Sequence, residues 1–473
     1  MATETVAIPE LERGVETHGI ERVSPQTRSH VRIFDNFTMW LSANLVISTV
    51  ATGALSRVAF GLGFWDSLAI ILIFNALGVL PVAFFSTLGP KLGLRQMTIS
   101  RFSFGWIGSI IMALFNVAAC IGWSAVNVII GGQLVEQLSN HTLPAWVGVL
   151  IIAVLTTTVS IYGYRYVHFY ERFAWIPMAV IFLVIFAISV PNAHIVATPD
   201  LTNVATIAGL LSFGGTVYGF ATGWSSFAAD YNVNQPEETP ARRVFWLTFL
   251  GVFIPCVLLE TLGLMLTTVP ALQKLEGGSL VAASADPLGI FGKIIVAFLA
   301  LSVVANNIPN DYSLGLSIQV FGRTFQRVPR WAWTLTGAVI YVILALILGA
   351  HFQETLTSFL LLIAYWLGPW AIILILEHFV FRKGQYNVDD WNTPAKLPLG
   401  WAAIVSLAIG LVGVVLGFAQ VFFINDQAIP ITGPIAGLVN QPYGIDIGFE
   451  LGLVLAGISY FILRRIELNA TKR

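Results

Sequence analysis

Residues 288–321 read LGIFGKIIVAFLALSVVANNIPNDYSLGLSIQVF, a long apolar run that carries a tight cluster of polar side chains in its second half. A helix that crosses the hydrocarbon core needs about 20 mostly apolar residues, and this stretch is longer. Apolar residues occur on all sides of such a helix and do not alternate as in a strand of a membrane β-barrel. The stretch therefore predicts a membrane-spanning helix with polar groups at membrane depth.

The rest of the chain shows the same pattern. The 473 residues are 56% hydrophobic and only 10% charged, whereas an ordinary soluble domain carries roughly 25% charged residues. This composition excludes a disordered chain and disfavours a soluble enzyme. We predict an all-α integral membrane protein with twelve transmembrane helices. The predicted spans are about 34–56, 65–88, 103–136, 143–162, 168–191, 204–228, 243–268, 288–321, 332–350, 354–380, 400–424 and 444–464.

The basic residues predict how the chain is oriented. All but three of the 24 Lys and Arg residues (Arg57, Lys274 and Lys293) fall in the two termini or in alternate loops. Cytoplasmic loops are enriched in Lys and Arg, so both termini are predicted to be cytoplasmic at a cell membrane. Residues 1–33 lack an apolar core behind a basic start and are predicted to be a tail, not a signal peptide; residues 465–473 are the other tail. A net charge of −1 with scattered bases disfavours nucleic acid as a partner.

This topology permits an internal repeat. Helices 1–5 (34–191) and 6–10 (204–380) would enter the membrane from opposite sides, as an inverted repeat demands, and helices 11 and 12 (400–464) would follow. The sixth segment holds four glycines between Gly214 and Gly223, which favour an unwound stretch; close packing through small residues is the alternative. We predict that helices 1 and 6, which hold equivalent positions, are discontinuous.

Two further segments carry polar side chains on one helix face. In the third, Asn116, Cys120, Trp123 and Asn127 are spaced four, three and four residues apart, so an indole plane lies beside amides that could bond the edge of a flat ring. The amides could instead form hydrogen bonds that hold neighbouring helices together. In the eighth, three asparagines and a carboxylate surround Pro309, where we expect the helix to be kinked or locally opened. Such groups are costly at membrane depth and often mark function.

Motifs of an enzyme are missing. The seven histidines are scattered, and the sequence holds no His-x-x-x-His, no Cys-x-x-Cys and no phosphate-binding loop ending in Lys-Ser or Lys-Thr. We therefore predict a protein that is not an enzyme and has neither a cofactor nor a metal site. Buried carboxyl groups can carry a proton, and Glu171, Glu260 and Asp311 are the candidates.

Together these elements resemble the nucleobase–cation symporter family, in particular its purine/cytosine permease branch, from about Phe34 to Arg465. The most specific stretches are Trp123 to Asn127, Gly223-Trp224-Ser225 and residues 305–313. The resemblance implies ten helices in a five-plus-five inverted repeat, two more helices, and a central site that holds an aromatic heterocycle between aromatic side chains.

The resemblance also implies roles for single residues. Trp123 and Trp224, with Gly223 beside it, would sandwich the base, and Asn127 would bond its polar edge. Asn306, Asn307 and Asn310 would recognise the base or hold the site, Ser42 and Asn44 would lie where helix 1 unwinds, and Glu171 matches a glutamate that some members need. Sodium-coupled members use eighth-helix hydroxyls where this chain has Val304 and Ala305. Because sodium prefers several oxygen ligands, we expect coupling to protons.

The resulting hypothesis is a proton-coupled importer of purine bases or cytosine. The alternatives are a sodium-coupled transporter of another heterocycle (hydantoin, allantoin, uracil, thiamine or pyridoxine), an amino-acid transporter of the same architecture, and a channel or receptor. The expected partners are a small nucleobase, a proton and the lipid bilayer.

Overall fold

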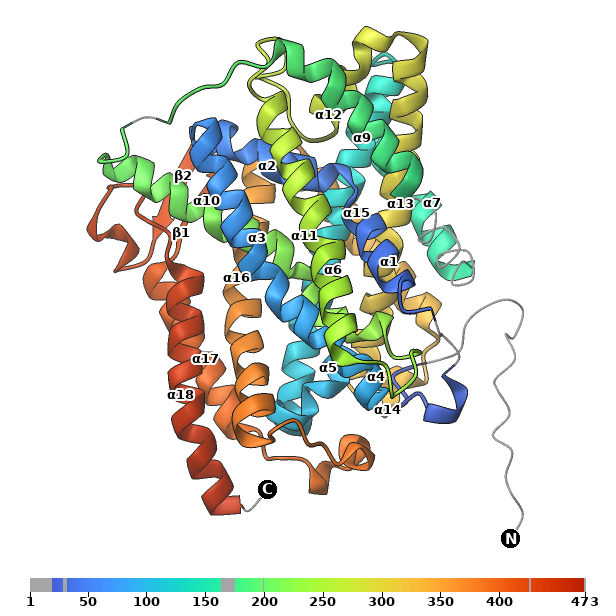
Figure 1. The fold of residues 1–473 in the computed structure, drawn as a ribbon, viewed down its shortest axis with the longest axis vertical. Helices are drawn as coiled ribbons and strands as arrows, with labels where there is room; N and C mark the ends of the chain where they lie inside the picture. The colour runs from blue at the N-terminus through green and yellow to red at the C-terminus, as the bar shows by residue number, and fades with distance from the viewer. Residues whose placement is uncertain (1–18, 29–31, 163–174, 199, 425–426, 472–473) are drawn as a thin grey trace.

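The computed structural model describes residues 19–28, 32–162, 175–198, 200–424 and 427–471. Most of this part of the chain is helical, and many of its long helices run along the vertical axis of Figure 1. Each of the twelve predicted spans contains a helix or a bent pair of helices. In chain order these are α1 Asp35–Asn44 with α2 Ile47–Val58, α3 Phe64–Ser86, α6 Arg101–Leu138, α7 Ala145–Tyr162, α9 Trp175–Ser189, α10 Val204–Thr222 with the 3₁₀-helix η3 Gly223–Tyr231, α11 Ala241–Leu266, α13 Ile290–Gln319, α15 Arg330–Leu348, α16 Phe352–Leu376, α17 Trp401–Gly417 and α18 Gly448–Thr471.

The length and composition of these helices suit a membrane. Among the described residues, seven helical stretches are long and apolar enough to cross one, the bent pair α1 and α2 makes an eighth, and one of the seven, Arg330–Phe381, contains both α15 and α16. Large apolar side chains are exposed on the outer faces, as at Trp65, which is 63% exposed. Exposed apolar surface of this extent needs lipid around it.

Short helices connect the spans at both ends of the bundle. They are α4 Leu88–Leu92, α5 Gln96–Ile99, α12 Gly277–Ala285 and α14 Arg323–Gln326. Arg22, near the described start of the chain, bonds Asp389 at 3.0 Å, and Glu467 in α18 accepts a bond from the Gly400 N–H at 2.8 Å. Asp389 and Gly400 belong to the same connection, so both described ends of the chain lie at one end of the bundle (Figure 1). An even number of spans requires this arrangement.

The prediction for the eleventh span was wrong in its last seven residues. Helix α17 ends at Gly417, and residues 419–424 form strand β1 (Ala419–Ile424), which pairs antiparallel with β2 (Gln427–Thr432). The sequence AQVFFI is rich in residues that favour strands, and a Cβ at Gly417 would approach the Ile447 carbonyl oxygen to 3.0 Å. Asn and Asp, which favour turns, follow this run in the sequence, and the prediction did not use them.

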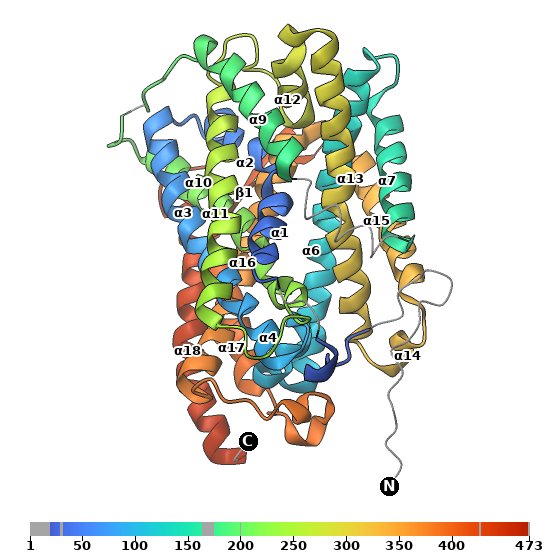
Figure 2. The ribbon, with the colours of Figure 1, turned by 45° about the vertical axis from the view of Figure 1, so that its right-hand side comes forward.

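Glycines bring the central helices into backbone contact. A Cβ at Gly53 of α2 would lie 1.9 Å from the Glu260 carbonyl oxygen of α11, and one at Gly263 of α11 would lie 1.8 Å from the Val50 carbonyl oxygen. Only glycine permits such an approach. Figure 2 shows α1 and α2 in the middle of the molecule, with α11 on one side of the view and α6 and α13 on the other.

Helix α18 is attached by a buried ion cluster to the residues that directly follow α16. Glu377 accepts hydrogen bonds from Arg464 at 3.0 Å and from the Tyr460 hydroxyl at 2.8 Å, and Arg382 pairs with the same carboxylate at 2.9 Å. Arg464 and Glu377 are no more than 2% exposed. Helices α17 and α18 therefore lie beside α16, outside the centre where the candidate site is formed (Figure 1).

Candidate binding site

Helix 1 is broken in its middle, as predicted. Helices α1 and α2 meet at an angle of 52° across Leu45 and Val46. A break leaves backbone carbonyl groups without helical N–H partners. Side chains donate hydrogen bonds to some of these carbonyl groups instead. The Thr49 hydroxyl donates to the Asn44 carbonyl oxygen at 2.8 Å, and Asn44 Nδ2 donates to the Trp40 carbonyl oxygen at 2.8 Å. Side chains of helix 1 itself therefore stabilise the broken segment.

In helix 6 the backbone changes from an α-helix to a 3₁₀-helix at Gly223. The change does not occur within the cluster of glycines before it. Helix α10 continues to Thr222, and the 3₁₀-helix η3 begins at Gly223. The earlier glycines serve close packing: a Cβ at Gly219 would lie 2.0 Å from the Leu360 carbonyl oxygen, and one at Gly214 would lie 2.6 Å from the Phe74 ring. The expected discontinuity is present, but the packing interpretation holds for the glycines that precede it.

Helix 8 is not opened at Pro309. We expected the helix to be kinked or locally opened at Pro309; helix α13 runs from Ile290 to Gln319 through the proline without an interruption, so it is not opened there. A proline within a membrane helix is tolerated where neighbouring groups satisfy the backbone. Asn306 and Asn310 therefore stay one helical turn apart on the same face, as the spacing predicted.

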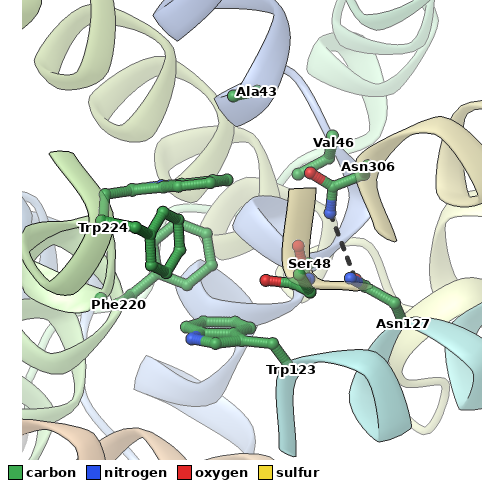
Figure 3. Close-up of a pocket in the computed structure, with 11 residues that line it drawn as sticks. Ala43, Val46, Ser48, Trp123, Asn127, Phe220, Trp224 and Asn306 are labelled. Atoms are coloured by element: carbon green, nitrogen blue, oxygen red, sulfur yellow. Dashed lines mark hydrogen bonds between the residues drawn. The ribbon is translucent and has the colours of Figure 1, made fainter. Parts of the chain in front are cut away.

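A pocket lies where the two broken helices meet α6 and α13. The space between its lining atoms, open solvent at its mouth included, is about 330 Å³. Figure 3 shows most of its lining side chains. The residues that line it are Ala43, Val46, Ser48, Trp123, Asn127, Phe220, Gly223, Trp224, Phe227, Asn306 and Asn310.

Two indole rings lie on opposite sides of this pocket. In Figure 3 the rings of Trp123 and Trp224 are both seen nearly on edge, with Phe220 at one side of the space between them. Trp123 is held edge-on by Phe220 and Phe359, with centroids 5.5 and 5.1 Å apart. A Cβ at Gly223 would approach Trp123 Cζ2 to 3.1 Å, so glycine at this position leaves room for the indole. The two aromatic faces can hold a flat ring between them.

Amides from α6 and α13 form a continuous hydrogen-bonded chain beside the rings. Asn306 Nδ2 donates to Asn127 Oδ1 at 3.3 Å, and Asn127 Nδ2 donates to Asn307 Oδ1 at 3.2 Å. Asn310 Nδ2 donates to the same Asn307 oxygen at 3.3 Å. The buried Asn306 Oδ1 has no partner among the described residues. One acceptor at the pocket is therefore available to a ligand, since a buried polar atom without a partner is costly.

Three of the predicted site residues do not line the pocket. Asn307 lies behind Asn127 and Asn310 as their acceptor. Asn44 is fully buried, and its Oδ1 accepts the Trp224 indole N–H at 2.9 Å. Ser42 lies in α1 and is not among the lining residues either. The predicted residues Trp123, Asn127, Gly223, Trp224, Asn306 and Asn310 are brought together.

Sequence reasoning missed five lining residues. Phe220 and Phe227 lie four residues before and three after Trp224, and this helical spacing could have identified them. Ala43 and Val46 flank the break in helix 1. Ser48 lies just after the break and contributes a hydroxyl to the pocket, and no pattern in the sequence distinguished it from the other small residues of α2.

The candidate proton carriers lie apart from the pocket lining. Glu260 of α11 is fully buried, and its Oε2 accepts a hydrogen bond from Asn75 Nδ2 at 2.6 Å. Asp311 of α13 is 1% exposed and accepts a bond from the Ser160 hydroxyl of α7 at 2.9 Å. Asp311 directly follows the lining residue Asn310, whereas Glu260 lies between α11 and α3. Glu171 is outside the described residues.

These features together define a class of protein. A ligand pocket between the interruptions of two broken helices, in a five-plus-five inverted-repeat bundle, is the arrangement of secondary transporters. The family of permeases for cytosine/purines, uracil, thiamine and allantoin matches residues 23–445. The chain belongs to this family, and it is a multi-pass membrane permease and not an enzyme.

Relatives of known name match nearly the whole chain. It is 39% identical over 469 residues to the purine-cytosine permease fcyB of Emericella nidulans, a match that covers 97% of this chain and 90% of fcyB. It is 32% identical over 519 residues to the vitamin B6 transporter TPN1 of Saccharomyces cerevisiae, covering 96% and 88%. The fold is similar to that of Mhp1, a nucleobase-cation-symport-1 family transporter in a closed conformation with bromovinylhydantoin bound. That match has a TM-score of 0.72, 15% identity and 96% coverage of both chains.

Proposed function

We propose that this protein imports purine bases, cytosine or both by proton symport, with the base held between Trp123 and Trp224. The observation that carries the proposal is the pocket itself: two indoles on opposite sides and an amide chain along an edge. A purine-cytosine permease as a relative at 39% identity supports the choice of substrate.

Stacking on the two indoles would provide affinity, and hydrogen bonds to the edge of the base would provide selectivity. Stacking on aromatic side chains contributes roughly 1–3 kcal/mol per base and tolerates any flat ring. The amides of Asn306 and Asn310 and the hydroxyl of Ser48 would bond the edge of the base. A base that leaves such a buried group unpaired loses about 1–3 kcal/mol, so these side chains would select among heterocycles.

Transport would follow from movement at the two broken helices. Both breaks lie at the pocket, one in each of the proposed repeats 34–191 and 204–380, so rocking one set of helices against the other would expose the same site to each side in turn. One contact that such a movement would change is at the end of η3. There the Gln96 N–H donates to Asp230 Oδ1 at 2.6 Å, and Arg95 donates to the Asp230 carbonyl oxygen at 2.8 Å.

Protons are the proposed driving ion. Val304 and Ala305 supply no side-chain oxygen for sodium at the position where sodium-coupled relatives have hydroxyls. Asp311 is one residue from the pocket lining, which favours it over Glu260 as the proton carrier; Glu171 is retained as a candidate from the family resemblance. We place the protein in the cell membrane with both termini cytoplasmic, because the basic residues gather at that end.

Uptake into proteoliposomes tests the proposal. Radiolabelled cytosine, adenine, guanine and hypoxanthine are offered under an imposed proton gradient and, separately, under a sodium gradient. We expect accumulation of at least one base with the proton gradient and none above the empty-liposome background with sodium alone. In Asp311→Asn, accumulation is expected to fall while exchange of external for internal base continues, since exchange needs no net proton movement.

Each other outcome has a definite meaning. Accumulation driven only by sodium contradicts the proton assignment. Radiolabelled pyridoxine is offered in a parallel assay, and its uptake without uptake of any base would contradict the proposed substrate and favour that of the vitamin B6 transporter. Equilibration without accumulation under either gradient would indicate a channel. Glu260→Gln is the matched control: if it abolishes accumulation and Asp311→Asn does not, the proton carrier is Glu260.

A further inference from the structure

The side chain of Asn44 connects the two broken helices. Asn44 is the last residue of α1, and Trp224 is the second residue of η3. Asn44 Oδ1 accepts the Trp224 indole N–H at 2.9 Å. The bond therefore joins the residue just before the break in helix 1 to the residue just after the change in helix 6.

The orientation of the Asn44 amide is set by a second bond. Its Nδ2 donates to the Trp40 carbonyl oxygen at 2.8 Å, and a carbonyl can only accept. The oxygen of the amide is thereby directed at the indole N–H, and the Cys256 thiol lies 3.5 Å from the same oxygen. Both polar atoms are occupied, and the side chain is fully buried outside the pocket lining. Asn44 is therefore not placed to contact a ligand.

The aromatic contacts of Trp224 pack against its ring but are not made to one particular atom of it. Trp40 and Phe227 meet it edge-on, with centroids 5.5 and 5.4 Å away and interplanar angles of 77° and 79°. Such contacts stabilise the ring at that place. The hydrogen bond from Nε1 is directional, so it determines which part of the indole face lies over the pocket.

We infer that Asn44 is a positioning residue for the stacking face of Trp224, and that through this ring it sets the preference for two-ring over one-ring heterocycles. This inference rests on the proposed function. A bicyclic base covers more of the indole than a monocyclic one, so a ring that slides or tilts loses more contact with the larger base. The helix break is held by the bond from Asn44 Nδ2 and by the Thr49 hydroxyl, whereas the bond at Oδ1 joins helix 1 to helix 6, and the Trp224→Phe background separates the two roles.

A double-mutant cycle tests the inference through the kinetics of adenine and cytosine uptake. Asn44→Ala removes the acceptor, and Trp224→Phe keeps an aromatic face but has no N–H to donate. We expect Asn44→Ala alone to raise the KM for adenine about tenfold and that for cytosine about threefold, with an unchanged maximal rate per transporter in the membrane. In the Trp224→Phe background the same substitution should change either KM by less than twofold. Cys256→Ala, which removes another neighbour of the same oxygen, should leave both KM values unchanged.

The cycle separates the inference from the proposed function. If the unaltered protein takes up no base, the proposed function fails. If it takes up bases and Asn44→Ala raises KM equally in both backgrounds, Asn44 does not act through the indole N–H and the inference is wrong. A fall in maximal rate at constant KM would show that Asn44 only supports the helix break, which also overturns it. Should Asn44→Ala not reach the membrane, Asn44→Ser, whose hydroxyl is too short to reach the indole, takes its place in the same cycle.

Discussion

Trp123→Ala is expected to raise the KM for base uptake about fivefold to 150-fold, while the protein still reaches the membrane. This range corresponds to the loss of one stacking face, roughly 1–3 kcal/mol. Trp123 lines the pocket opposite Trp224, and its ring is held by Phe220 and Phe359. Trp123→Phe keeps a smaller aromatic face, so its KM should lie between the KM of the unaltered protein and that of Trp123→Ala. The measurement is the initial rate of radiolabelled base uptake against base concentration.

Trp65→Ala is the matched control for that substitution. Trp65 is 63% exposed on the outer face of α3 and is not part of the pocket. Its replacement should leave KM unchanged. An unaltered KM in Trp123→Ala, with transporter amounts equal by immunoblot, would remove Trp123 from the binding site.

Asn310→Ala is expected to abolish measurable uptake at substrate concentrations that saturate the unaltered protein. The substitution removes an amide that lines the pocket and leaves the Asn307 oxygen without one of its two donors. A polar group left unpaired on the base costs about 1–3 kcal/mol, and Asn307 Oδ1 keeps only its bond from Asn127. The loss on the base lowers apparent affinity about fivefold to 150-fold, and the weakened amide chain lowers it further.

Asn116→Ala provides the comparison, because it removes an amide from the same pair of helices away from the pocket. Asn116 of α6 donates to the Ser317 hydroxyl of α13 at 2.7 Å. Its loss should lower stability without changing KM. If Asn310→Ala transports with the kinetics of the unaltered protein, the amide chain has no role in recognition.

The parts of the site that could be predicted from sequence are those governed by helical spacing. Trp123 and Asn127 lie one turn apart in α6, as do Asn306 and Asn310 in α13, and a continuous helix keeps each pair on one face. Their polar or aromatic side chains at membrane depth identified them as candidate site residues. The break in helix 1 was expected from its position, which is equivalent to that of helix 6 in an inverted repeat.

The parts that could not be predicted depend on which helix packs against which. Gly219 allows α10 to approach the Leu360 carbonyl oxygen of α16 and is not a site of unwinding. This role can be recognised only once the position of α16 is known. Asn44 and Asn307 have the same polar side chain as the lining asparagines, but neighbouring residues bond to the oxygen of each side chain. Spacing along one helix indicates a face, whereas the partner across that face is set by the tertiary fold.

A structure of the purified protein in lipid nanodiscs with saturating adenine tests the central claim most directly. Saturation is established beforehand by equilibrium binding of radiolabelled adenine. We predict density for a flat ring between Trp123 and Trp224, with one edge within hydrogen-bonding distance of Asn306 or Asn310. Adenine bound at another place, with the space between the two indoles empty, would contradict it.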